Sequence, residues 1–179
     1  FDTLILDIDG VVELALLFSH IIDFRSTFTA WHSAGVADTA EQLAKLMGFS
    51  TYECKMMRIA GYLHDLGKLA IDQDLLEKNS SLSEEEFCQV RAHAYYTYYL
   101  LRAIPQFQII NIWASYHHER LDGTGYPDGL KGEQIGQLAR MNTICDVYDA
   151  ITSDRPYKKG WSPAIALQHM AKWRGNHLD

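Results

Sequence analysis

Residues 50–68, STYECKMMRIAGYLHDLGK, decide the fold class of this chain. The segment opens on a capping box, because the hydroxyl of Ser50 can accept a hydrogen bond from the backbone N–H three residues on while Glu53 reaches back. We expect the helix to run to about Leu66, with Gly67 as its C-terminal residue of positive φ. The segment therefore predicts a well-capped helix that ends on an imidazole and a carboxylate.

Helical signals flank this segment on both sides. Apolar residues with helical spacing precede a helix stop at Gly48, namely Val36, Ala40, Leu43 and Met47. A second capping box at residues 83–86 begins a helix that we expect to end near Pro105, and Ser162 precedes a proline at a first helical position. Between His117 and Gly132 the pattern gives way to glycine. The sequence predicts an all-α domain, a bundle of roughly six to eight helices with a glycine-rich loop.

Composition and charge narrow the classes of function. The chain has 179 residues, with 16 Lys and Arg against 23 Asp and Glu, and its net charge of -7 disfavours binding to long nucleic acid. A small anionic substrate stays open, because bound metal ions can supply local positive charge. With 3 scattered Cys and no long apolar segment, we expect a reduced, cytoplasmic domain without a membrane span or signal peptide.

Two short motifs suit metal binding. His64-Asp65 places an imidazole beside a carboxylate, although such a dipeptide by itself is more often a solvated helix end. His117-His118-Glu119, followed directly by a glycine-rich turn, is much harder to explain by chance. The second motif is therefore stronger evidence for metal binding than the first.

Four further residues are candidates on weaker grounds. Asp146 and Asp149 interrupt a helical segment that otherwise looks buried, where a carboxylate is costly unless it is paired or metal-bound. His32 and His93 lie alone on expected helices, and such residues are more often satisfied core or surface groups. These patterns alone leave the metal-ligand and the structural interpretations open.

Four segments of the chain, taken in order, resemble the HD-GYP family of metal-dependent phosphodiesterases. They are HSAGVADTAEQLAKLMGFS at 32–50, HDLGK at 64–68, HHERLDGTGYP at 117–127 and DVYDAITSDRPYK at 146–158. The element Gly125-Tyr126-Pro127, with its preceding histidine pair, separates this family from the wider HD hydrolases. The resemblance implies an HD-type helical bundle with a GYP loop.

The resemblance also implies a centre of two divalent transition-metal ions. One ion would be held by His32, His64, Asp65 and Asp146, and Asp65 would bridge to a second ion held by His93, His117 and His118. Some family members hold a third ion through a Glu four residues before the first histidine. That position is Phe28 here, which argues for two ions. Iron or manganese suits such ligands best, and zinc or nickel also fits.

The activity that the resemblance implies is hydrolysis of cyclic di-GMP to pGpG, and in some members on to GMP. A hydroxide bridging the two ions would attack phosphorus in line. Asp65 and Lys68 would be the catalytic residues, Lys68 also binding a phosphate oxygen of the substrate. By the same resemblance, Arg155 and Lys158 would hold the substrate's phosphate or guanine, and Asp149 would orient a ligand or a water molecule.

Other expectations concern partners and a rival function. The loop residues Gly125, Tyr126 and Pro127 would lie beside the site, where they can meet partner proteins, and a homodimer is compatible with the sequence. The alternative function is a metal-binding or degenerate cyclic-dinucleotide sensor without turnover. His177 matches no motif, so we expect it to be a surface group.

The N-terminal residues 1–10, FDTLILDIDG, alternate apolar and polar side chains and end in glycine, as a short strand would. Asp7 and Asp9 also look like the strand-plus-DxD motif of haloacid-dehalogenase-type phosphatases. That fold needs alternating strands and helices, whereas the residues after this segment have a helical pattern, so we interpret the match as chance or as the end of another domain. We expect residues 1–12 to be an N-terminal segment, the end of a preceding domain, and residues 13–179 to be the catalytic domain.

Overall fold

The computed structural model describes residues 5–25, 31–154 and 158–179. Within these residues the fold is all-helical, without a β-strand, as predicted. The α-helices are α1 (Ile8–Phe24), α2 (His32–Leu46), α3 (Thr51–Leu63), α4 (Gln73–Leu76), α5 (Glu84–Leu101), α6 (Gln108–Ser115), α7 (Gln137–Thr152) and α8 (Pro163–Met170). Short 3-10 helices are η1 (Leu66–Ala70), η2 (Pro105–Phe107), η3 (Gly132–Gln134) and η4 (Ala171–Trp173).

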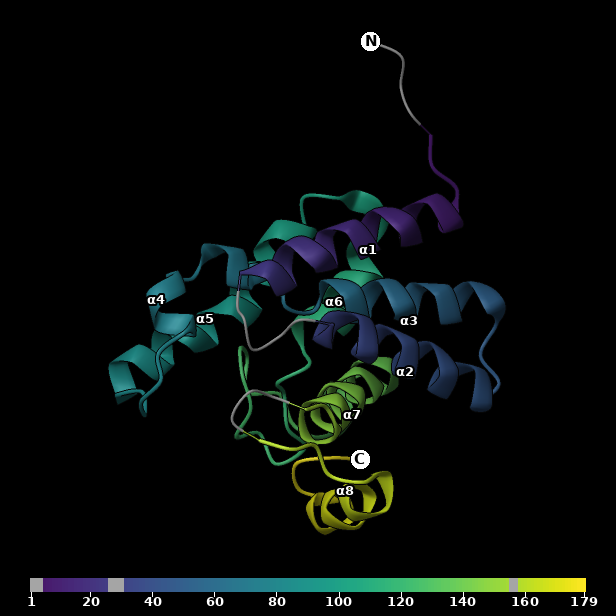
Figure 1. The fold of residues 1–179 in the computed structure, drawn as a ribbon. Coiled ribbons are helices and arrows are strands. Elements are labelled where there is room, and N and C mark those ends of the chain that lie inside the picture. Colours follow the sequence, from purple (N-terminus) through teal and green to yellow (C-terminus); the bar gives the residue numbers. More distant parts are fainter. Residues whose placement is uncertain (1–4, 26–30, 155–157) are drawn as a thin grey trace.

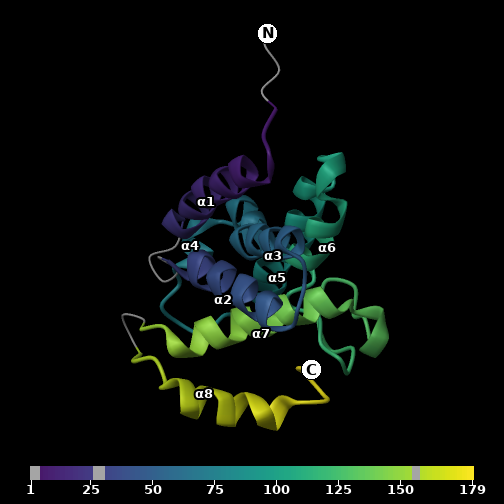
Figure 2. The ribbon, with the colours of Figure 1, turned by 90° about the vertical axis from the view of Figure 1, so that its right-hand side faces the viewer.

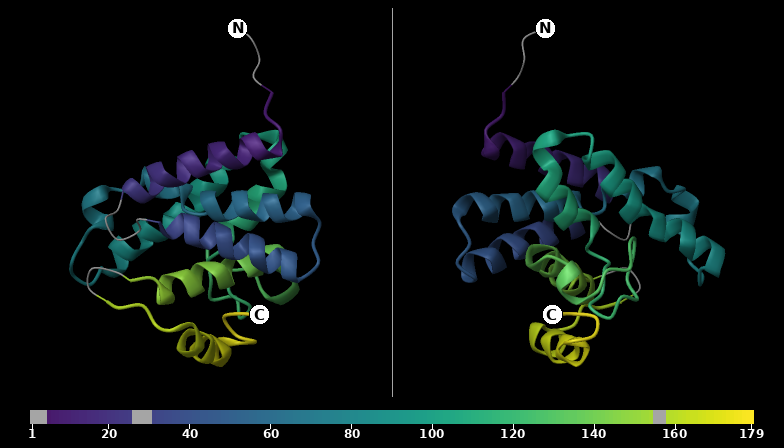
Figure 3. Two further views of the ribbon diagram at one scale, coloured as in Figure 1. Left: turned by 45° about the vertical axis from the view of Figure 1, so that its right-hand side comes forward. Right: turned by 180° about the vertical axis from the view of Figure 1, so that it is seen from behind.

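The helices stack around α3. Helix α3 contacts α1, α2, α6 and α7, so it lies at the centre of the bundle. Figures 1 and 3 show α1, the α2–α3 pair, α7 and α8 following one another from top to bottom. Figure 2 shows α7 crossing beneath α2, with α8 below it. In the described part of the chain, none of the helices combines the length and hydropathy needed to cross a membrane.

The hydrophobic core has two parts on either side of the α2–α3 pair. The half-buried ring of Trp113 packs against both parts. One joins α1, α2, α3, α5 and α6 through Ala15, Ala37, Met56, Ile59, Ala60, Tyr62, Leu63, Leu101, Ile110 and Ala114. The other joins α2, α3 and α7 through Val36, Ala40, Ala44, Cys54, Met57, Leu138, Met141 and Cys145. Burial of these apolar side chains is the main force that holds the helices together.

The local helix signals in the sequence are largely confirmed. The hydroxyl of Ser50 accepts from the backbone N–H of Glu53 at 3.2 Å, and the Glu53 carboxylate accepts from the Ser50 N–H at 2.8 Å. The box at residues 83–86 forms in the same way at the start of α5. Gly48 follows α2 with φ of 83°, as a helix stop does. Helix α5 ends at Leu101, before the expected end near Pro105, where η2 begins.

The prediction of a strand over residues 1–10 is wrong for the described part of that segment. Helix α1 begins at Ile8, because the Asp7 side chain accepts a hydrogen bond from the N–H of Gly10 at 2.8 Å and so caps the helix. Asp9 lies within this helix, not in the strand that the phosphatase motif requires, and it pairs with Lys55 of α3 at 2.6 Å. The expected domain boundary after residue 12 falls inside α1, and the assignment of residues 1–12 to a preceding domain stays a prediction.

The prediction for Gly67 is also wrong. Helix α3 ends at Leu63, and Gly67 lies within η1 with a φ outside the positive region. A Cβ atom at Gly67 would overlap the backbone oxygen of His93 in α5. The Gly67 N–H donates to the hydroxyl of Thr97 at 2.9 Å, and that hydroxyl donates to the carbonyl of His64 at 3.0 Å. Gly67 is needed here because it lets η1, which follows α3, approach α5 closely.

Candidate metal centre

The histidines and aspartates singled out in the sequence converge at the centre of the bundle. They come from α2, from the end of α3, from α5, from the turn after α6 and from α7. The seven candidate ligands are all buried except His118, which is half-buried, and Asp149 beside them is also half-buried. Three overlapping groups have ligand atoms within 4.8 Å of one another: His93, His117 and His118; His32, His64 and Asp146; and His64, Asp65 and His117. Each group could hold a metal ion.

The first side of the centre is built on Asp146. Its Oδ1 lies 3.1 Å from Nε2 of His32 and 3.9 Å from Nε2 of His64. The Nε2 atom of His64 is fully buried and makes no hydrogen bond to the residues that the structure describes. A buried polar atom without a partner is costly, and a metal ion at this point would satisfy it.

The second side of the centre is built on Asp65. Its Oδ1 lies 3.4 Å from Nε2 of His93 and 3.9 Å from Nε2 of His117, while its Oδ2 lies 3.2 Å from Nε2 of His64. The two Nε2 atoms of His93 and His117 are 3.3 Å apart. The two carboxylate oxygens of Asp65 therefore face the two sides of the centre.

Backbone carbonyls fix the orientation of three histidine rings. The Nδ1 atoms of His64, His93 and His117 lie 2.7, 2.6 and 2.6 Å from the carbonyl oxygens of Gly61, Val90 and Ala114. A carbonyl can only accept, so each Nδ1 carries a proton, and in the neutral form of each ring the lone pair of Nε2 points inward. Outer hydrogen bonds of this kind set the tautomer of metal-binding histidines.

This tautomer assignment makes the pair His93 and His117 informative. With both Nδ1 protons donated to carbonyls, the two neutral rings direct lone pairs at each other across 3.3 Å. Two facing lone pairs repel, whereas a cation between them is attracted to both. The donor set, imidazole nitrogens and carboxylate oxygens, is that of a borderline transition metal, so the residues fit such an ion.

Burial holds several of these rings neutral. It lowers the pKa of His117 far below its usual value, and it lowers the pKa of His118 to about 3 in spite of the nearby Asp146 carboxylate. The pKa of His93 shifts in the same direction, because burial outweighs the attraction of Asp65. Neutral imidazoles bind a metal ion without first losing a proton.

The pKa of His32 shifts the other way. Burial opposes its charge, but hydrogen bonds to Asp146 and Asp149 outweigh burial and raise the pKa to about 10. The pKa of Asp65 is held well below its usual value, since Lys68 and His64 together outweigh the cost of burial. The carboxylate of Asp65 is therefore ionised, which is the form that binds metal.

Of the described residues expected to act beside the ligands, Lys68 and Asp149 lie at the centre and Lys158 does not. The Nζ atom of Lys68 lies 2.5 Å from Oδ2 of Asp65. Oδ2 of Asp149 lies 2.7 Å from Nδ1 of His32. Lys158 is exposed, with its ammonium 4.8 Å from the ring centre of Trp161, and it does not line the cavity beside the histidines. Arg155 and Phe28 lie outside the described residues.

The GYP loop covers one side of the centre. The Tyr126 ring lies 4.7 Å from the His118 ring. The guanidinium of Arg91, a residue of α5, lies 4.5 Å from the centre of the Tyr126 ring. The Tyr126 N–H donates to the carbonyl of His118 at 3.1 Å. Tyr126 therefore forms a wall of the site. Whether the loop meets partner proteins stays a prediction.

Sequence reasoning missed the role of Glu119. Its buried carboxylate accepts hydrogen bonds from the N–H groups of Asp128, Gly129 and Leu130 at 2.7, 3.1 and 2.8 Å. Glu119 thus holds the far end of the GYP loop in place. The available signal was an acid next to the histidine pair, but nothing local indicated that its partners are backbone amides nine or more residues away.

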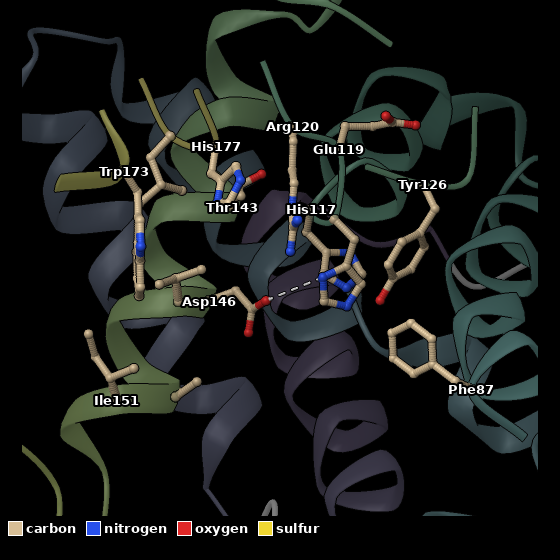
Figure 4. Close-up of a pocket in the computed structure, with 14 residues that line it drawn as sticks. Phe87, His117, Glu119, Arg120, Tyr126, Thr143, Asp146, Ile151, Trp173 and His177 are labelled. Carbon is tan, nitrogen blue, oxygen red and sulfur yellow. Dashed lines mark ion pairs between the residues drawn. The ribbon is translucent and has the colours of Figure 1, made fainter. Parts of the chain in front are cut away.

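A cavity of about 410 Å³ opens beside the histidines (Figure 4). It is lined by Phe87, His117, His118, Glu119, Arg120, Tyr126, Thr143, Asp146, Val147, Ala150, Ile151, Trp173, His177 and Leu178. The expectation that His177 is a plain surface group is incomplete, because it lines this cavity and its Nε2 lies 3.4 Å from Oδ2 of Asp122. The cavity volume lies within the usual range of small-molecule sites.

Comparison with known proteins agrees with this architecture. A family model described as HD domain matches residues 17–179. The chain is 44% identical over 153 residues to a cyclic di-GMP phosphodiesterase of Pseudomonas aeruginosa, covering 85% of this chain and 37% of that protein. It is 36% identical over 157 residues to 3'3'-cGAMP-specific phosphodiesterase 1 of Vibrio cholerae, covering 88% of this chain and 36% of that protein. The chain thus spans well under half the length of these relatives.

The fold has a solved counterpart. Bd1817, a HDG"Y"P protein from Bdellovibrio bacteriovorus, superposes with a TM-score of 0.68 at 18% identity, over 96% of this chain and 60% of that one. The all-α bundle and its buried histidine and carboxylate groups define a helical domain able to hold metal ions. The chain belongs to the HD domain family, and its resemblance to the HD-GYP proteins is confirmed.

Proposed function

We propose that this domain hydrolyses a cyclic dinucleotide, cyclic di-GMP, to the linear pGpG, using two divalent transition-metal ions. The Pseudomonas and Vibrio relatives act on cyclic di-GMP and 3'3'-cGAMP, and the first is the more similar in sequence. The observation that carries the proposal is the pair of Nε2 atoms of His93 and His117, 3.3 Å apart with both Nδ1 atoms bound to carbonyls. A cation between the two rings would stabilise this arrangement.

The candidate ligands divide between two ions. His32, His64, Asp65 and Asp146 would hold one, and Asp65, His93, His117 and His118 would hold the other. The position of Asp65 supports a bridging role, because its two oxygens face the two groups. Iron or manganese suits this mixed set of donors, and zinc or nickel is the alternative.

The bound ions would supply Lewis acidity toward the phosphate and a hydroxide nucleophile at neutral pH. In the overall reaction the oxygen of one water joins phosphorus, one P–O3′ bond breaks, and the leaving 3′ oxygen gains a proton. Lys68 is placed to donate to a phosphate oxygen, since its ammonium already lies at the Asp65 carboxylate. Asp149 holds the ring of His32 by its Nδ1 edge and so keeps Nε2 directed at the centre.

Groups farther out would hold the rest of the substrate. By resemblance to the family, Arg155 and Lys158 would contact its phosphate or guanine. Lys158 is an exposed cation beside the Trp161 ring, so it is free to reach an approaching anion. Tyr126 and Phe87 form the wall of the cavity on the side of α5 (Figure 4).

The test is a product assay on protein of known metal content. Chelator-treated protein is reloaded separately with iron(II), manganese, zinc or nickel, and elemental analysis counts the ions per chain. Each preparation is incubated with cyclic di-GMP, 3'3'-cGAMP or cyclic di-AMP, and chromatography with mass detection resolves the products. We expect about two ions per chain and conversion of cyclic di-GMP to pGpG, which chelation abolishes. Protein that holds two ions and binds cyclic di-GMP without cleaving it would be a sensor, and the proposal would fail.

A further inference from the structure

We infer that Trp173 and Arg120 form a nucleobase subsite at the far end of the cavity, an inference that rests on the proposed function for its choice of ligand. One end of the cavity is formed by the metal-centre residues His117, His118 and Asp146. The opposite wall comes from the C-terminal segment, with Trp173 as its large aromatic side chain. A nucleotide with its phosphate at the metal centre would therefore extend toward Trp173 (Figure 4).

The C-terminal wall is held in place by the loop that follows the histidine pair. The N–H of Asp122 donates to the carbonyl of Asn176 at 2.8 Å, and the Asp122 carboxylate pairs with His177 at 3.4 Å. The carbonyl of Trp173 accepts from the N–H groups of His177 and Leu178, each at 3.0 Å. These bonds fix the backbone of the turn that carries Trp173, so the turn loses little freedom when a ligand binds.

The surface between the metal centre and Trp173 suits a flat, apolar-faced ligand. The apolar residues of α7 that line the cavity are Val147, Ala150 and Ile151, all half-buried, on the helix that also carries Asp146. Figure 4 shows the Trp173 ring nearly edge-on, so that one face of the indole is turned toward the cavity. A nucleobase has two apolar faces and a polar edge, and its stacking on an aromatic side chain changes affinity by about 5- to 150-fold.

Arg120 supplies a group for the polar edge of the base. Its exposed side chain lines the cavity, and its guanidinium makes no hydrogen bond or ion pair within the described part of the chain. In Figure 4 it extends into the space between Trp173 and the histidines. A guanidinium can donate two parallel hydrogen bonds to O6 and N7 of guanine, whereas adenine offers a donor in place of O6. Trp173 would thus bind any base, and Arg120 would favour guanine.

The test of stacking compares Trp173→Ala with Trp173→Phe, and uses Asn176→Ala as a control that removes an exposed uncharged side chain from the same turn. We expect Trp173→Ala to raise KM for cyclic di-GMP at least about 5-fold. With methyl 4-nitrophenyl phosphate as substrate, both kcat and KM should stay unchanged, because that diester carries no base. Trp173→Phe keeps an aromatic face and should stay near wild type. Equal losses on both substrates, or no loss on either, would overturn the subsite.

A binding measurement separates this inference from the proposed function. Equilibrium dialysis compares GMP with ribose 5-phosphate, which lacks the base, and needs no turnover. Suppose that the wild-type protein cleaves no substrate but binds GMP, and that Trp173→Ala binds GMP more weakly. The phosphodiesterase proposal then fails and the subsite stands. If GMP binds both proteins equally, the subsite is wrong even if cyclic di-GMP is cleaved.

The guanine preference has its own variant. Arg120→Lys keeps the charge and removes the forked donor pair. We expect its KM to rise for cyclic di-GMP and to change little for cyclic di-AMP. Equal rises for both would assign Arg120 to the phosphate and overturn its role at the base edge.

Discussion

Oδ2 of Asp149 lies 2.7 Å from Nδ1 of His32, on the ring edge opposite the Nε2 atom that faces Asp146. An ionised carboxylate can only accept, so the Nδ1 proton of His32 is held on the side away from the centre. Metal-binding histidines are commonly oriented by an outer carboxylate in this way. The contact joins α2 to α7, two helices that also pack together through the core.

This contact predicts a role for Asp149 in metal affinity. Asp149→Asn should weaken binding of one ion about 10- to 100-fold while the other ion stays bound, because only the ring of His32 loses its outer carboxylate. A competitive titration against a chelator measures both affinities. Glu85→Gln removes an exposed carboxylate from the first turn of α5 and should change neither. Unchanged affinities in Asp149→Asn would assign the carboxylate a purely structural role.

Asp65 should be required by both ions at once. Its oxygens face His64 on one side and His93 on the other, so Asp65→Ala is expected to lower the metal content from about two ions per chain to near zero and to abolish hydrolysis. Elemental analysis after dialysis checks the count, and circular dichroism checks that the helices persist. A variant that keeps one tightly bound ion, or that turns over normally, would show that Asp65 does not bridge.

The stability of the metal-free protein should depend on pH with a maximum near neutrality. The pKa values of His93, His117 and His118 are lowered from 6.5. Below that value the unfolded chain binds protons that the folded chain does not, so stability falls with pH by about 1.4 kcal/mol per unit for each group. His32 acts in the opposite sense: with a pKa raised from 6.5 to about 10, its contribution is full below 6.5 and is lost as pH rises toward 10.

Urea unfolding of chelator-treated protein between pH 5 and 9 measures this dependence. His118→Gln removes one of the lowered groups and should make the acidic limb shallower. A free energy of unfolding that stays level or rises from pH 7 to pH 5 would mean that these rings are protonated in the folded state.

Glu119 should control the order of the GYP loop. Glu119→Gln replaces an acceptor of three backbone N–H groups by an amide with one acceptor oxygen, so at least one buried donor loses its partner. We expect a loss of about 1–3 kcal/mol in unfolding free energy. Hydrogen exchange should speed up at the amides of residues 128–130. Protection equal to wild type at those amides would contradict the role, and Glu133→Gln, which changes an almost fully exposed carboxylate, is the control.

Gly67 should tolerate no side chain. Gly67→Ala would overlap the backbone of α5 at His93, and we expect it to cost at least about 2 kcal/mol and to reduce metal affinity by displacing His93. Gly136→Ala is the matched control, because a Cβ there meets nothing within 4 Å and its φ of -57° suits alanine. Thermal unfolding of both variants measures the difference. Equal stabilities would show that η1 can shift away from α5 at little cost.

Local sequence signals were sufficient to predict the helix ends that are set by hydrogen bonds between nearby residues. The capping boxes at Ser50 and Ser83 and the stop at Gly48 lie where the sequence indicates, because their hydrogen bonds join residues three or four apart. The short alternating segment at the N-terminus misled, since alternation over so few residues does not distinguish a strand from a capped helix start. Asp7 decides the matter through its hydrogen bond to Gly10.

The sequence by itself determined the helical class and the set of ligand-type residues, because residue chemistry and motif order are written in the chain. Only the tertiary structure decided what those residues meet: the Gly67 contact with α5, the hold of Glu119 on the GYP loop, and the place of Trp173 opposite the histidines. Each of these depends on segments distant in sequence coming together, and burial of the shared core, not local propensity, sets that packing.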